Sequence, residues 1–258
     1  MCVQHPFLNK RPSSCLWNMD LGIDYILEAG AKAECDIELI TKALLMYHNF
    51  VRYVGNTPYD PAMVAASALH LSSRAVEKEL EIDALVFLFY HMVNGTADNL
   101  HPGTMKFSVL KKSLITIICI MQRMLVFNLR YNIAHQYLAT FLSVLQQKAS
   151  HIDGFLEKMG DTSLKFINDF YINKMCLNYK PADICIACIE AALQVHGYQS
   201  HLSALQPWFH GFSDVSENKV TEMVHNIFLL YKDKDKMVSS TSEEDDDSVE
   251  KNNNTVEG

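Results

Sequence analysis

The sequence predicts an all-α protein made of two similar helical modules. Apolar residues recur at three- and four-residue spacing through most of the chain, which is the pattern of helices with one buried face. The 258 residues include only 10 Gly and 7 Pro, too few for an all-β chain broken by many turns. A segment that occurs twice indicates that the helices are arranged as an internal duplication.

The duplicated segment begins with a Tyr-x-Pro-Ala string. One copy begins at Tyr59 and the other, 120 residues later, at Tyr179. Branched apolar and small side chains then recur at matching positions, as at Val64 and Ile184. Pro suits the first helical position, where its missing N–H costs nothing. Because small side chains on the next turns let neighbouring helices approach closely, each copy is predicted to open a central packing helix.

The first half of the chain contains five predicted helices. Asp36 is suited to cap the second helix and Asp60 the third, since a short side-chain oxygen can accept from the first free N–H groups. Between Ile115 and Met121 the fifth helix is apolar on nearly every side. Its β-branched residues favour a strand locally, but its length and its lack of turn residues favour a buried helix. The five predicted ranges are 21–33, 37–51, 61–77, 80–93 and 105–126.

The second half repeats this order and is followed by a polar tail. Residues 1–20 lack periodicity and are predicted to form an extended arm. Residues 235–258 are rich in Ser, Asn and acidic side chains that cannot bury surface, which predicts a disordered acidic tail. The first module is therefore placed at 21–130 and the second at 131–234. The helices predicted in the second half are 134–149, 162–175, 181–195 and 216–231.

Charge and composition exclude several classes of function. The formal net charge is −8, of which −5 lies between Lys232 and Gly258, so the rest of the chain carries −3. Without a basic surface, nucleic-acid binding is disfavoured. The longest apolar run, Leu114–Met121, is far too short to span a membrane, so no membrane partner is expected. Seven scattered Cys and the absence of a basic-then-apolar leader suggest reduced thiols inside the cell.

No residue pattern specifies a catalytic, metal or cofactor site. Cys185 and Cys188 have the spacing of a redox or zinc pair, but no second pair accompanies them. Both lie in an apolar helical pattern, so we expect them to pack in the core as small hydrophobic residues. The 11 His show no ligand spacing, and no phosphate-binding Gly loop or Gly-x-Ser-x-Gly turn is present. These observations favour a binding protein over an enzyme.

Seven short strings occur in a characteristic order along residues 21–232. They are Glu28–Gly30, Tyr47–Phe50, Tyr59–Pro61, Arg123–Phe127, His135–Leu138, Leu193–Gly197 and Gln206–Phe209. In this order and spacing they resemble landmarks of the cyclin family. The resemblance implies a cyclin fold of two consecutive five-helix modules, in a chain that has no active site of its own.

The resemblance also implies a partner and a mechanism. A cyclin forms a heterodimer with a cyclin-dependent protein kinase, and the resemblance implies a partner like kinase ten. The first module packs on the αC helix of the kinase and holds it inward, which brings the catalytic Lys–Glu pair and the metal-binding Asp into register. The implied role is that of an activating subunit in cell-cycle or transcription control, in the nucleus and cytoplasm with the nucleus favoured.

Kinase-binding residues can be carried over position by position. In typical cyclins a Lys at the end of the third helix and a Glu in the fifth form a polar anchor. The Lys position corresponds to Arg74, which keeps the charge but presents a planar fork of donors. The Glu position corresponds to Ile118, which is expected to act as an apolar floor. The other expected kinase-binding residues are Leu71, for the surface meeting αC, and the charged group Glu77, Lys78 and Glu81.

Ile118 is a departure from the family pattern, because an isoleucine cannot pair with a cation. Two alternatives remain open. In the first, kinase binding is retained, because Arg74 finds another acceptor, with Glu77 as the candidate, or because the kinase surface has changed to match this chain. Alternatively, activation is weakened and the chain is a scaffold or a transcription-factor-like adaptor of the same fold. The surviving Arg favours retained binding.

Overall fold

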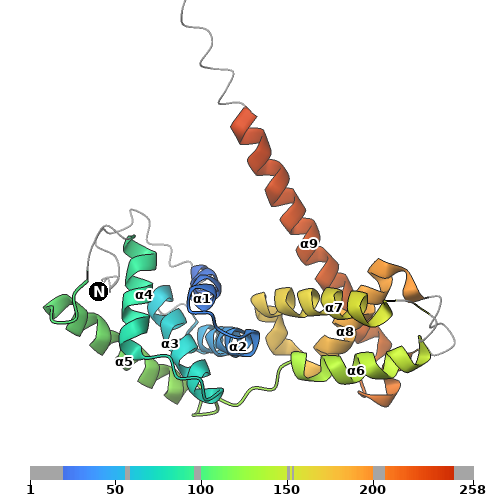
Figure 1. Cartoon of the computed structure of the whole chain (residues 1–258), viewed down its shortest axis with the longest axis horizontal. Helices are drawn as coiled ribbons and strands as arrows, with labels where there is room; N and C mark the ends of the chain where they lie inside the picture. The colour runs from blue at the N-terminus through green and yellow to red at the C-terminus, as the bar shows by residue number, and fades with distance from the viewer. Residues whose placement is uncertain are drawn as a thin grey trace, which may run out of the picture. The chain divides into compact units, whose positions relative to one another are not determined.

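The computed structural model describes residues 20–55, 59–95, 100–149, 152, 154–199 and 207–246, with backbone alone at 148 and 233–246. Every regular element in this part of the chain is a helix, which confirms the predicted all-α class (Figure 1). The arm predicted at 1–20 lies outside the described residues except for its last residue.

The described helices belong to two compact units. Within the described residues, the first unit combines the chain from residue 20 to Gln136 with Asn168–Lys180. The second combines the segment from Tyr137 to Ile167 with the residues from Pro181 to 246. This division differs from the boundary predicted between 130 and 131. A buried side chain of the first unit explains the difference: His48 Nε2 donates to the carbonyl oxygen of Tyr171 at 3.1 Å, which holds the later segment in the first unit.

Helix α3 (Pro61–Ala75) is the centre of the first unit. It packs against four helices and is buried along most of its length, because its early turns carry small side chains (Figure 1). Pro61 occupies the first position, and the Asp60 carboxylate accepts the Ala62 N–H at 2.9 Å, as predicted for an N-cap. The surrounding helices are α1 (Leu21–Lys32), α2 (Ile37–Val54), α4 (Ile82–Asn94) and α5 (Met105–Met124).

Helix α8 (Pro181–His196) is the counterpart of α3 in the second unit. It also begins with Pro at its first position and is buried over most of its length, which confirms that both copies of the duplicated segment open central helices. The second unit shows four α-helices in its described residues, where five were expected, and a 3₁₀ helix, η3 (Trp208–Gly211), lies between α8 and α9. The other elements after α5 are α6 (His135–Lys148), α7 (Phe155–Ile172), η1 (Lys174–Asn178) and α9 (Glu217–Asp246).

Two predicted helix boundaries are wrong by more than three residues. Helix α7 begins at Phe155 and not at 162, because Phe155 and Met159, one turn apart, are both buried and extend its apolar face. The backbone of α9 continues to Asp246, although a disordered tail was predicted from 235. Residues 232–246 contain no Gly or Pro, so no local signal ends the helix there. The rest of the predicted tail, 247–258, lies outside the described residues.

Cys185 and Cys188 belong to the core of the second unit. Both side chains are fully buried in α8, which confirms the predicted packing role. Burial raises the pKa of the Cys185 thiol to about 12, so the thiol is protonated at neutral pH. Across the described residues there is no group of three His, Cys, Asp or Glu side chains that could hold a metal ion, and no helix has the length and apolar character needed to cross a bilayer.

Candidate functional site

Arg74 lies in the last turn of α3, and its side chain is 56% exposed. The helix ends in a Schellman motif, in which the Lys78 N–H donates to Ser73 O at 2.9 Å and the Glu77 N–H donates to Arg74 O at 3.3 Å. Glu77 takes the left-handed position at φ 58°, where Gly is the usual residue. This motif reverses the chain, so that residues 78–80 return alongside the helix they have just left.

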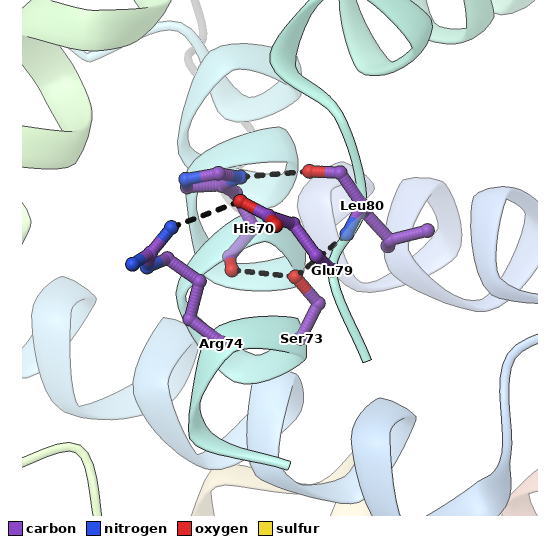
Figure 2. A network of polar contacts seen from close by, with 5 residues as sticks. All are labelled: His70, Ser73, Arg74, Glu79 and Leu80. Atoms are coloured by element: carbon purple, nitrogen blue, oxygen red, sulfur yellow. Dashed lines mark hydrogen bonds and ion pairs between the residues drawn. The ribbon is translucent and has the colours of Figure 1, made fainter. Parts of the chain in front are cut away.

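Two α3 side chains hold Leu80 by both of its backbone polar groups (Figure 2). The fully buried Ser73 hydroxyl accepts the Leu80 N–H at 3.2 Å and donates to His70 O at 2.8 Å. His70 Nδ1 lies 3.0 Å from the Leu80 carbonyl oxygen. Because a carbonyl can only accept, the proton is on Nδ1. Burial lowers the pKa of His70, which favours this neutral form. We call Ser73, His70 and Leu80 the clamp.

The clamp brings Glu79 to Arg74. Arg74 Nη1 donates to Glu79 Oε1 at 3.1 Å, and the two side chains are 56% and 71% exposed (Figure 2). The expectation that Glu77 would accept from Arg74 is therefore wrong. Glu77 is at the left-handed turn position, whereas Glu79 is the residue next to Leu80, whose backbone the clamp fixes against α3.

The other charged residues expected at this site lie around the same turn. Lys78 forms an ion pair with Asp36, the residue before α2. Asp36 occupies the predicted N-cap position but makes no side-chain capping hydrogen bond. Glu77 is exposed, and Glu81 is an exposed residue at the N-cap position of α4. Glu77, Lys78 and Glu81 thus belong to the exposed turn between α3 and α4, and Arg74 precedes it in the last turn of α3.

Leu71 and Ile118 lie beneath the surface. Leu71 is 0% exposed, so the expectation that it forms part of the contact surface is wrong; it faces the core, one turn before Arg74. Ile118 is 7% exposed and lies in α5, which packs against α3. Its burial suits an apolar floor, and its contact with a kinase stays a prediction.

The end of α5 presents two apolar side chains that the sequence interpretation did not single out as binding residues. Val126 and Phe127 are 77% and 69% exposed. They follow a second Schellman motif, in which the Phe127 N–H donates to Gln122 O at 2.8 Å and the Val126 N–H donates to Arg123 O at 3.0 Å. Both have left-handed φ angles, 52° and 55°, which are costly for a β-branched residue such as Val126. Strained residues of this kind are concentrated at functional sites.

Comparisons with known proteins support the fold. No family model matches the sequence. A chain in the structure of the CAK complex from Chaetomium thermophilum bound to ATP-gamma-S is similar, with a TM-score of 0.62 and 16% identity over 84% of this chain and 63% of that chain. A chain in the yeast TFIIK (Kin28/Ccl1/Tfb3) complex is also similar, with a TM-score of 0.55 and 14% identity over 81% of this chain and 84% of that chain.

The chain has the cyclin fold. At these identities the likeness concerns the fold alone, and the chain spans less than two thirds of the length of the matched CAK chain. Arg74 lies at the end of the central third helix of this fold. The resemblance to cyclins predicts a cationic kinase anchor at that position.

Proposed function

We propose that the chain is a non-catalytic cyclin subunit that binds a cyclin-dependent protein kinase and activates it by positioning the kinase αC helix. The observation that carries this proposal is the exposed cation of Arg74 at the end of the central helix of a cyclin fold. The similar solved chains come from the CAK complex bound to ATP-gamma-S and from Kin28/Ccl1/Tfb3, which supports a role in a kinase assembly.

The proposed partner is a kinase like kinase ten. Within the cyclins, the seven sequence strings most resemble cyclin Q, also called cyclin M, the regulatory partner of that kinase. We accordingly propose a heterodimer that acts in cell-cycle or transcription control, mainly in the nucleus. Stable heterodimers of this kind bury on the order of 1,600 Å² of surface.

The described surface offers the groups that such an interface needs. A guanidinium has five N–H donors and can bind more than one acceptor, including the free carbonyl groups at a helix C-terminus. Val126 and Phe127 offer exposed apolar surface, and large aromatic side chains commonly act as anchors at interfaces. Polar contacts from Arg74 and apolar contacts from the end of α5 would together fix the orientation of αC, which kinase activation requires.

Co-purification with the kinase-ten catalytic subunit tests the proposal. Arg74→Glu reverses the anchor charge and is expected to abolish capture of the kinase while leaving the helical circular dichroism unchanged, because Arg74 is more than half exposed. Arg52→Glu is the matched control, since Arg52 is also an exposed arginine in the last turn of a helix, α2. Undiminished kinase capture by Arg74→Glu would contradict the proposal that Arg74 anchors the kinase.

The alternative function is a cyclin-fold scaffold or adaptor that does not activate a kinase. The apolar residue Ile118 at the family Glu position favours it. A peptide phosphorylation assay separates the two, because an activator raises the rate of the kinase whereas a scaffold binds without raising it. A salt-dependent shift of duplex DNA by the purified chain would instead indicate the transcription-factor-like adaptor.

A further inference from the structure

We propose that Glu79 is a positioning residue for the kinase anchor: from the turn between α3 and α4 it supplies the carboxylate that α5 lacks at Ile118. This inference rests on the proposed function and adds to it a residue that the family pattern does not provide. The ion pair between Arg74 and Glu79, at 3.1 Å, is the contact from which it starts (Figure 2).

The backbone on both sides of Glu79 is fixed by α3. On one side the Lys78 N–H is bound by Ser73 O at 2.9 Å, and on the other the Leu80 N–H and C=O are bound by Ser73 Oγ and His70 Nδ1. Ser73 is fully buried and His70 is 7% exposed, so these partners are themselves held in place by packing. The position of the Glu79 carboxylate is therefore built into the turn, although its side chain is exposed.

The neighbouring charged residues do not share this role. Lys78 is paired with Asp36 and is directed to the start of α2. Glu77 and Glu81 form no ion pair with any residue that the structure describes. Among the charged residues of this turn in the described chain, Glu79 is thus the carboxylate that meets Arg74.

Positioning by Glu79 would favour kinase binding for two reasons. An arginine that moves freely must lose side-chain entropy when it is ordered at an interface, and an existing hydrogen bond reduces that loss. Glu79 engages Nη1, which leaves the other N–H donors for carbonyl oxygens of the partner. When the interface closes, the guanidinium also keeps a carboxylate partner and is not left buried and unpaired.

A double-mutant cycle tests this role. The affinity of the purified kinase-ten catalytic subunit for the full chain is measured by calorimetry with Glu79→Gln, with Arg74→Gln and with both changes. Glu79→Gln is expected to weaken binding about fivefold, the upper range for an exposed ion pair. In the Arg74→Gln background it is expected to have no further effect, because Glu79 acts through Arg74. Glu28→Gln is the control: Glu28 is 51% exposed, pairs with Lys32 and is expected to leave affinity unchanged.

Two results would overturn the positioning role. Wild-type affinity of Glu79→Gln is one. The other is a double variant whose fold-loss of kinase affinity equals the product of the two single losses. That result would mean that Glu79 contacts the kinase independently of Arg74. If the wild-type chain does not bind the kinase, the proposed function fails separately. The role of Glu79 is then decided by nuclear magnetic resonance: Glu79→Gln, but not Glu28→Gln, is expected to lower the heteronuclear NOE of Arg74 Nε, and an unchanged NOE overturns the inference.

Discussion

Replacement of Ser73 by alanine tests whether the clamp stabilises the turn that carries Arg74 and Glu79. The change removes the hydroxyl that accepts the Leu80 N–H at 3.2 Å. It also removes the bond that the hydroxyl donates to His70 O, but that carbonyl lies inside α3 and retains its helical partner. The main loss is therefore one unpaired amide at Leu80.

The expected loss follows from that single amide. An unpaired buried donor costs about 1–3 kcal/mol, and since Leu80 is only half-buried we expect about 1–2 kcal/mol. For a chain of this size each kcal/mol lowers the melting temperature by about 2–4 °C. Urea unfolding measures the loss in free energy, and hydrogen exchange of the Leu80 amide shows whether the turn opens locally.

Ser143→Ala is the matched control for this prediction. Like Ser73, Ser143 donates its hydroxyl to the carbonyl three residues earlier, Thr140 O, at 2.8 Å. It is exposed and accepts no amide among the residues that the structure describes, so its removal is expected to change stability by less than about 0.5 kcal/mol. If the two variants lose equal stability and Leu80 exchanges no faster in Ser73→Ala, the clamp does not hold the turn.

Three further predictions concern the burial of individual residues. Gly22→Ala would drive a Cβ into the ring and hydroxyl of Tyr47, which is 1% exposed and packed in the core, so urea unfolding should show a loss of about 1–3 kcal/mol. Burial lowers the pKa of His48 below 6.5, so as the pH falls the unfolded chain takes up the proton before the folded chain does. The free energy of unfolding should therefore fall as the pH is lowered from about 7.5 to about 5.5, and it should fall less steeply in His48→Asn. Thiol labelling with mass spectrometry should modify the exposed Cys119 in the native protein but leave Cys188, buried with a raised pKa, unmodified.

Sequence-based prediction succeeded where a feature depends on neighbouring residues. The two central helices begin at the predicted Pro residues, and the Asp60 cap forms as expected, because capping involves residues only two positions apart. The early start of α7 was missed because Gly160 interrupts its pattern, although Phe155 and Met159 are both buried. The place of Asn168–Lys180 in the first unit was missed because it depends on a contact between His48 and Tyr171.

The sequence by itself determined the helical class, the duplication and the position of Arg74 at the end of a central helix, since composition, periodicity and the repeated string encode them locally. Only the tertiary structure decided which carboxylate meets that arginine. Glu77, Glu79 and Glu81 are alike in sequence, but a left-handed turn at Glu77 and the hydrogen bonds on Leu80 bring Glu79 to Arg74. Backbone direction after a helix end is set by such contacts, which residue type alone does not specify.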